Sequence, residues 1–83
     1  MSAHASHRLD TTGQRCPVPL LLTARVLADL APGAHLLVLG DDPEMVADLR
    51  AWCQTSGHRW LGVTTTGTLA VCEIERVAAE PPS

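Results

Sequence analysis

Hydrophobic and polar residues follow two kinds of spacing along the chain, one typical of strands and the other of helices. Ala70, Cys72 and Ile74 fall on one face of their segment, and Glu73 and Glu75 fall on the other. This alternation is typical of a strand with one buried side. The compact apolar run at 35–39 is typical of a central strand. Strands are predicted at residues 8–12, 35–39, 58–65 and 69–76.

The first helix is predicted over residues 17–30, which are rich in Leu and Ala. Pro17 suits the first helical position because no amide donor is needed there, and Pro19 still lies in the first turn. The sequence Ala-Pro-Gly at 31–33 ends the helix.

The second helix is predicted over residues 43–56. Asp42 is expected to be its N-cap and Pro43 its first residue, and Gly57 suits the position after its last turn. We expect Asp41 and Asp42 to act as capping residues and Asp48 to be a solvated helix position. One face of this helix carries Met45, Leu49, Trp52 and Cys53.

The resulting element order, β-α-β-α-β-β, predicts an α/β (α+β) two-layer sandwich. A four-stranded mixed sheet would carry two helices on one face. The 83 residues allow a single domain, with an ordered core expected at about 8–76 and loose ends on either side. The other face of the sheet would be open, and a contact in an oligomer could cover it; we expect a monomer or a weak oligomer.

Composition excludes several classes of protein. The net charge is −3 and all six cationic side chains are Arg, so a basic nucleic-acid-binding surface is not expected. No apolar run is long enough for a membrane helix, and the first residues do not read as a signal peptide. Three cysteines, 37 and 19 residues apart, fit neither a disulfide framework nor a zinc site. A cytoplasmic protein with free thiols is therefore predicted.

Cys16 immediately precedes the first predicted helix and carries the strongest chemical signal. The positive end of the helix dipole, together with Arg15, should favour a thiolate, so the thiol is expected to ionise more readily than a free cysteine. Pro17 and Pro19 should hold Cys16 outward, where it could act as a nucleophile or a sulfur carrier. The competing interpretation is a buried small residue at a helix start.

A helical wheel places Val18, Leu21, Leu22 and Arg25 on the outward side of the first helix. We interpret them as a patch beside the thiol for docking another protein, unless the helix is covered more widely than the wheel implies.

The remaining cysteines, tryptophans and histidines favour structural roles. Cys53 and Cys72 are expected in the core, Trp52 on the core side and Trp60 on the opposite face of the sheet. Asp10 should hydrogen-bond amides of the following turn or of a helix start. No ligand spacing accompanies His35 or His58, so no metal site is expected.

These residues resemble a family. The pattern Leu9-Asp10-x-x-Gly13-x-x-Cys16-Pro17-x-Pro19 looks like that of the TusA (SirA-like) small sulfur-carrier proteins. The resemblance extends through Asp41-Asp42-Pro43, Asp48, Cys53 and Gly57-His58 and covers residues 8–76. It implies the same two-layer fold, and a sulfurtransferase that carries persulfide sulfur on Cys16 without another cofactor. Arg15, Pro17, Pro19, Gly13 and Asp10 would support the site.

By resemblance, the sulfur donor would be a cysteine desulfurase, a rhodanese or another carrier. The acceptor would belong to tRNA thiolation, cofactor assembly or dissimilatory sulfur oxidation. Three features depart from the family: Gln14, Cys72 and the absence of Lys, which leaves docking to Arg15 and Arg25. The alternative function is a non-catalytic redox-sensing or regulatory binding module that uses Cys16. A thiol-disulfide oxidoreductase is disfavoured because no Cys-x-x-Cys is present.

Overall fold

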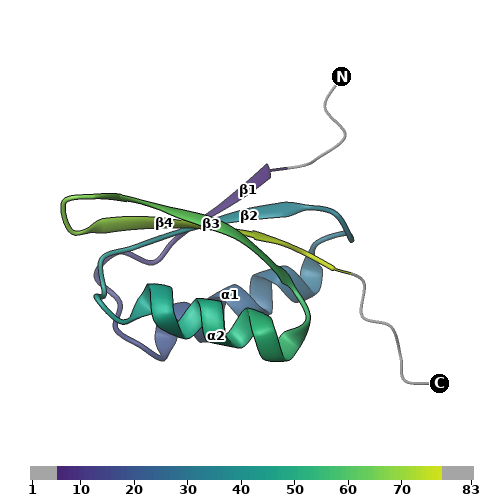
Figure 1. Cartoon of the computed structure of the whole chain (residues 1–83), viewed down its shortest axis with the longest axis horizontal. Helices are drawn as coiled ribbons and strands as arrows, with labels where there is room; N and C mark the ends of the chain where they lie inside the picture. The colour runs from purple at the N-terminus through teal and green to yellow at the C-terminus, as the bar shows by residue number, and fades with distance from the viewer. Residues whose placement is uncertain (1–5, 78–83) are drawn as a thin grey trace.

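The computed structural model describes residues 6–77 and contains the six expected elements in the expected order (Figure 1). The predicted ends of the domain, residues 1–5 and 78–83, lie outside the described part of the chain. The elements are β1 (Ser6–Asp10), α1 (Val18–Asp29), β2 (His35–Gly40), α2 (Met45–Ser56), β3 (Arg59–Thr66) and β4 (Leu69–Glu75).

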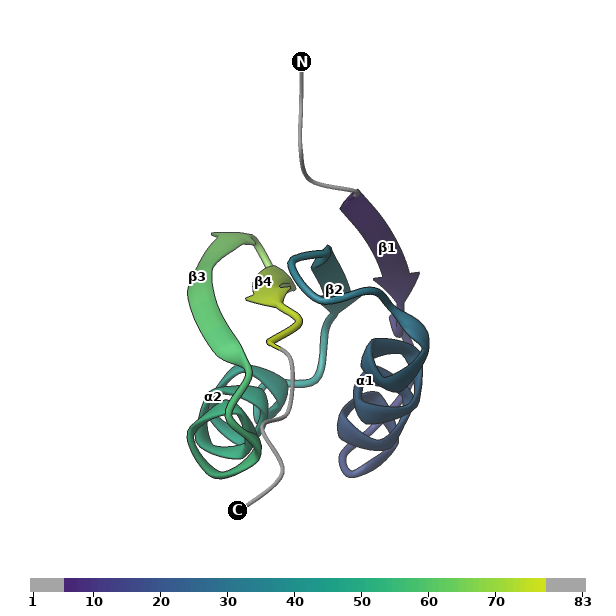
Figure 2. The same ribbon diagram turned by 90° about the vertical axis from the view of Figure 1, so that its right-hand side faces the viewer.

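The four strands form one mixed sheet in the order β1-β2-β4-β3. β1 runs parallel to β2, whereas β2 and β3 both pair antiparallel with β4. Figure 2 shows both helices on the same side of this sheet, so the molecule has two layers, as predicted. Because β1 and β2 are parallel neighbours, the loops that follow them leave the sheet at the same edge.

The core lies between the sheet and the two helices. Alternate residues of β2 and β4 point into it, and Cys53 and Cys72 are buried there as expected. Trp52 packs against this cluster. The buried cluster consists of Leu27, Leu36, Val38, Met45, Leu49, Cys53, Ala70, Cys72 and Ile74.

Both helices begin later than predicted. Pro17 is the N-cap of α1 rather than its first residue, and Glu44 rather than Asp42 is the N-cap of α2. Residues 43–44 form a turn, in which the Met45 amide donates to the Asp42 carbonyl at 3.1 Å. Asp42 caps this turn instead, because its side chain accepts the Glu44 amide at 3.1 Å. Gly57 ends α2 in the left-handed conformation, as predicted.

Trp60 lies on the core side of the sheet, so the prediction that it faces the other side was wrong. It pairs with Ile74 and packs against the buried cluster. The register of β3 against β4 shifts between Trp60 and Gly62, which leaves Leu61 as an extra residue in the strand. Such a bulge changes which residues face the core and defeats simple alternation.

A close contact fixes the segment after β1 onto the rest of the fold. Thr11 is fully buried, and its hydroxyl donates to the Leu39 carbonyl at 2.7 Å. Gly40 leaves no room for a side chain, because a Cβ there would collide with the Met45 sulfur and the Thr11 hydroxyl. The end of β2, the start of α2 and the chain after β1 therefore meet at this point.

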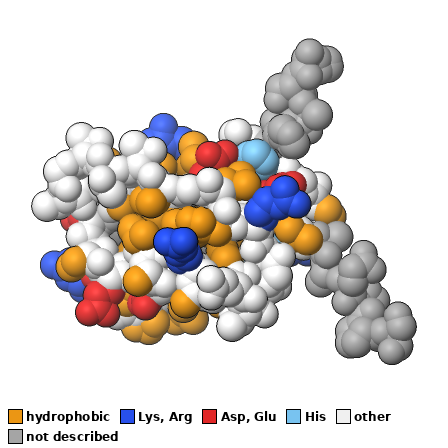
Figure 3. Space-filling view, in the orientation of Figure 1, with side chains coloured by type: hydrophobic (Ala, Val, Ile, Leu, Met, Phe, Trp, Pro, Cys, Tyr) orange, Lys and Arg blue, Asp and Glu red, His pale blue; other side chains and the backbone are white. Residues whose placement is uncertain are grey.

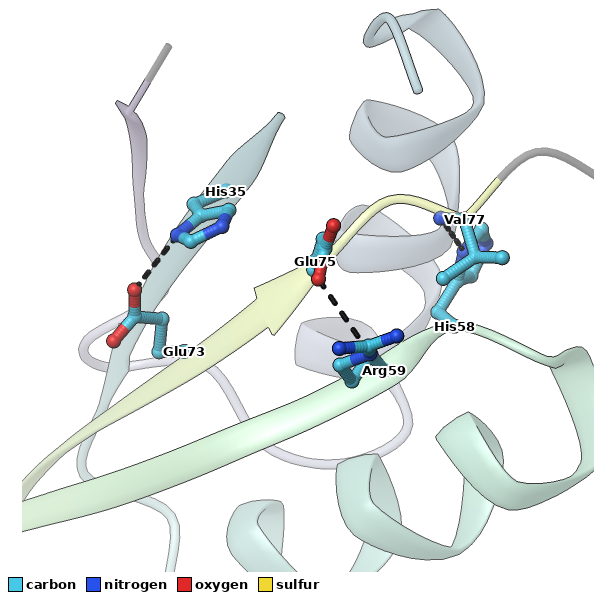
Figure 4. Close-up of polar contacts among 6 residues, drawn as sticks. All are labelled: His35, His58, Arg59, Glu73, Glu75 and Val77. Atoms are coloured by element: carbon cyan, nitrogen blue, oxygen red, sulfur yellow. Dashed lines mark hydrogen bonds and ion pairs between the residues drawn. The ribbon is translucent and has the colours of Figure 1, made fainter. Parts of the chain in front are cut away.

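Polar pairs lie at the end of the sheet where β2 and β3 begin and β4 ends (Figure 4). His35 Nδ1 lies 3.0 Å from Glu73 Oε2, and Arg59 Nε lies 3.6 Å from Glu75 Oε1. The Val77 amide donates to His58 Nδ1 at 3.2 Å.

His58 is partly desolvated, which holds its pKa below the ordinary value, and the charge of Arg76 acts in the same direction. Within residues 6–77 no group of three His, Cys, Asp or Glu side chains is placed to hold a metal ion. No helix in this range is long and apolar enough to span a membrane.

Candidate functional site

The candidate site forms where the loop after β1 meets the loop after β2. Both loops leave the same edge of the sheet, and α1 and α2 start at this end of the molecule (Figure 1). Acidic side chains gather at this end in Figure 3. The two loops are joined by hydrogen bonds from backbone amides of the first to carboxylates of the second. Asp41 accepts the Gly13 amide at 3.0 Å, and Asp42 accepts the Cys16 amide at 2.5 Å.

Asp42 is the central acceptor of this junction. One of its carboxylate oxygens accepts the Cys16 amide, and the other accepts the Glu44 amide. These backbone hydrogen bonds hold the pKa of Asp42 below its ordinary value, and the charge of Arg15 contributes a smaller effect. Asp42 is only 8% exposed. An ionised carboxylate is therefore held in a fixed position next to Cys16.

Cys16 is half-buried and borders a shallow pocket of about 350 Å³. This pocket is open to solvent, so a group from another molecule can reach the sulfur. Arg15 supplies the pocket with one positive side chain, and Asp42 and Glu44 supply two negative ones. The lining residues are Arg15, Cys16, Asp42, Pro43 and Glu44.

The prediction of a readily ionised Cys16 was wrong, because its pKa is raised to about 12. Burial is the largest cause, followed by hydrogen bonding of the thiol to the carboxylates of Asp48 and Asp42 and by their negative charges.

The helix start offers little to offset these effects. The Val18 amide already donates to the Arg15 carbonyl at 2.8 Å, and Pro19 has no amide hydrogen. Two of the donors expected to stabilise a thiolate are therefore missing or occupied.

The structure places the predicted supporting residues around this loop. Gly13 has a φ of 84°, which favours glycine. Asp10 accepts the Thr12 amide at 2.9 Å and the Thr12 hydroxyl at 2.7 Å, as expected for a residue that shapes the turn. Pro19 is buried beneath α1, whereas Arg15 and Pro17 are exposed. The peptide bond between Cys16 and Pro17 is cis.

Most of the predicted docking patch is exposed on the first turns of α1. Val18 is 37% exposed and Leu21 61% exposed, and Arg25 is also exposed. Leu22 is half-buried, so its predicted outward position is only partly correct. The buried face of α1 runs through Pro19, Thr23 and Leu27, and Leu22 lies at the flank of this face.

Sequence reasoning missed the residues that control the thiol. Asp48 was expected to be solvated and Asp42 to be a capping residue. Both carboxylates instead contribute to the raised pKa of Cys16. Topology could have revealed them, because the ends of parallel neighbouring strands meet at one edge of a sheet. The acidic residues after β2 would then be expected beside the loop after β1.

Comparisons with known proteins agree with this geometry. The family model described as sulfurtransferase TusA matches residues 7–76. A crystal structure of a SirA-like protein from Desulfitobacterium hafniense has a similar fold, with a TM-score of 0.76 and 22% sequence identity. The match covers 87% of this chain and 99% of that one. Since the family model spans nearly all of the described residues, this chain belongs to the TusA family of sulfurtransferases.

Proposed function

We propose that this protein carries sulfur as a persulfide on Cys16 and relays it between partner proteins. The observation that carries this proposal is the position of Cys16, half-exposed beside an open pocket at the start of α1 in a member of a sulfurtransferase family. Cys53 and Cys72 are buried in the core and cannot be reached in the same way. The proposal places the carrier in the cytoplasm, where reducing conditions keep thiols free.

The transfer step needs no external oxidant. Cys16 Sγ forms a bond to the outer sulfur of a persulfide on the donor, and the sulfur–sulfur bond of the donor breaks. The donor sulfur leaves as a thiolate and receives the proton that Cys16 loses. One persulfide and one thiol enter the step, and one of each leaves it. Delivery to the acceptor is the same exchange with the carrier as the donor.

We assign docking of both partners to the exposed side of α1. Val18 and Leu21 present apolar surface next to the thiol, and Arg25 adds a positive charge on the same side.

A cysteine desulfurase, a rhodanese or another carrier would donate sulfur. An acceptor in tRNA thiolation, cofactor assembly or dissimilatory sulfur oxidation would receive it. Labelled sulfur on the loaded protein, offered to one acceptor of each kind, identifies the pathway.

The proposal is tested by intact mass spectrometry after incubation with a cysteine desulfurase and cysteine, or with a rhodanese and thiosulfate. The wild-type protein should gain one sulfur atom, which a reductant removes, and peptide mapping should locate it on Cys16. The Cys16→Ser variant should gain none. Equal uptake by Cys16→Ser, or uptake located on Cys53 or Cys72, would show that Cys16 is not the carrier residue.

A further inference from the structure

We propose that two copies of this chain associate through the free edge of β3, which pairs antiparallel with β3 of the second copy. The paired stretch is residues 62–66, with Thr64 opposite Thr64 at the two-fold axis. The two four-stranded sheets then form one continuous sheet. This contact does not involve Cys16 and is independent of the role proposed for that residue.

The two edges of the sheet, β1 and β3, differ in how they are protected against pairing (Figure 2). β1 has only five residues, and His7, Arg8 and Asp10 are among them. β3 has eight residues, and its one charged residue is Arg59 at the first position. A short length and charged side chains are common means of keeping a sheet edge from pairing with another chain. β1 has both of these features, whereas β3 after Arg59 has neither.

The regular part of the β3 edge runs over residues 62–66. The bulge at Leu61 lies before this stretch, and the hairpin turn follows it. Within residues 6–77, no backbone hydrogen bond from another segment reaches its side away from β4. Unpaired amides and carbonyls at a sheet edge are the groups that bind an added strand. The chemistry of this edge therefore calls for an extended strand.

Exposed hydrophobic side chains lie along the same edge. Among residues 6–77, the exposed large hydrophobic residues are Val18, Leu21, Leu61 and Val63. The first two belong to the α1 surface assigned to partner docking. Leu61 and Val63 lie in β3 and are 38% and 42% exposed. Hydrophobic side chains gather on the face formed by β3 and α2 (Figure 3), which lies away from α1 (Figure 2).

The occupant is a second copy because the β3 edge is complementary to itself. Val63 pairs with Cys72, which points into the core, so the Val63 side chain lies on the helix side of the sheet. On that side a hollow of about 310 Å³ lies between the β3–β4 hairpin and α2, with Val46 and Thr65 in its lining. Antiparallel pairing about Thr64 places Val63 of each copy opposite Thr65 of the other. Each exposed valine then lies beside the hollow of the other copy, in a reciprocal two-fold contact.

The charges on this side of the molecule allow two copies to meet. Residues 62–66 carry no charge, and the two Arg59 side chains lie at opposite ends of the contact. Each Arg59 Nε lies 3.6 Å from Glu75 Oε1 of its own chain. Arg50 lines a hollow along α2, whereas Asp41 and Asp42 line the hollow at the hairpin, so charges of both signs are present. Because the paired stretch is short, a weak dimer is expected.

The test is sedimentation velocity of the reduced protein between about 10 µM and about 1 mM. The average mass of the wild-type protein should rise with concentration towards twice the monomer mass. Val63→Lys places a charge within the contact and should remain monomeric at every concentration. Leu21→Lys makes the same change at an exposed hydrophobic residue of α1 and should associate like the wild-type protein. Circular dichroism shows whether each variant is folded.

Disulfide cross-linking in the Cys16→Ser background tests the pairing register. Thr64→Cys places a thiol at the two-fold axis, where the two Cα atoms would be about 5 Å apart and within reach of a disulfide. Thr66→Cys places the thiol opposite Gly62, about 13 Å along the strand from its counterpart. With oxidised glutathione, Thr64→Cys should form a covalent dimer and Thr66→Cys should not.

A wild-type protein that remains monomeric at about 1 mM overturns the proposal. The β3 edge would then be open to a strand of a different protein. Equal association of Val63→Lys and Leu21→Lys also overturns it, because the contact would lie elsewhere. Cross-linking of Thr66→Cys rather than Thr64→Cys would show that the strands do not pair about Thr64.

Discussion

Cys16 and Cys72 both resist ionisation, but for different physical reasons. Cys72 lies in the core between sheet and helices, where burial raises its pKa to about 11 with a smaller contribution from Cys53. Cys16 lies beside an open pocket, and two carboxylates add to the effect of burial to raise its pKa to about 12. A thiol at a helix start is thus not acidic by virtue of the helix alone. The groups that the tertiary structure brings to it decide its protonation.

The largest expected effect is a loss of stability at alkaline pH. The pKa values of Cys16, Cys53 and Cys72 are all raised from 9.0, to about 12, 11 and 11. The folded state therefore binds these protons more tightly than the unfolded chain does. Their stabilising contribution is complete below pH 9 and is lost as the pH rises towards 11. Each thiol should lower the free energy of unfolding by about 1.4 kcal/mol per pH unit in this range.

Urea unfolding at pH 8, 9 and 10 measures this loss. The chain has no Lys and no Tyr, so few other side chains titrate in the same range. Cys16→Ser should reduce the slope of stability against pH by about one third, since one of three thiols is removed. An unchanged slope would mean that the fold does not raise the pKa of Cys16. The contrast drawn between Cys16 and Cys72 would then be wrong.

The next effect separates the two cysteines at neutral pH. Cys72→Ser places a hydroxyl in an apolar, fully buried site and should lower the free energy of unfolding by about 2 kcal/mol. Cys16 lies at the surface pocket, so Cys16→Ser should change the free energy of unfolding by less than about 0.5 kcal/mol. Chemical unfolding at pH 7 compares the two variants directly. Similar losses in both would show that Cys16 is a packing residue rather than a site residue.

A smaller effect of opposite sign is expected on the buried face of α1. Thr23 is fully buried, and its hydroxyl has no hydrogen-bond partner among the described residues. Thr23→Val keeps the shape and removes the unsatisfied group, so the free energy of unfolding should increase by about 1 kcal/mol. Cys16 should be alkylated at the wild-type rate in this variant. A change in that rate would show that packing under α1, and not only the carboxylates, controls the thiol.

The smallest expected effect is a loss of stability in mild acid. Partial burial and the charge of Arg76 lower the pKa of His58 in the folded state. Its stabilising contribution is therefore present above the unfolded pKa, about 6.5, and decreases as the pH falls through the folded value. His58→Gln should make stability less dependent on pH between 7 and 5 than it is in the wild-type protein. Melting temperatures across this range give the comparison.

Periodicity was sufficient to predict the architecture, because each of its signals lies within one segment. The alternation in β4 and the helical face through Met45, Leu49 and Cys53 depend only on neighbouring residues. The face of Trp60 could not be obtained in this way, since it depends on a bulge in the pairing of β3 with β4.

The protonation of Cys16 was also beyond local reasoning. The helix dipole and Arg15 are local features, and they favour a thiolate. The opposing groups lie far along the chain, and the amide of Cys16 is 26 residues from its acceptor Asp42. Only the parallel pairing of β1 with β2 brings the two loops together.

That long-range bond has a consequence for protein engineering. A synthetic peptide of the Cys-Pro-x-Pro segment, or the same segment grafted onto the helix of an unrelated scaffold, would retain the cysteine and both prolines but not the carboxylates. Its thiol would react with small electrophiles faster than the Cys16 thiol of the intact domain does. A minimal transplant must therefore include the chain from β1 through the first turn of α2, which is more than half of the described residues.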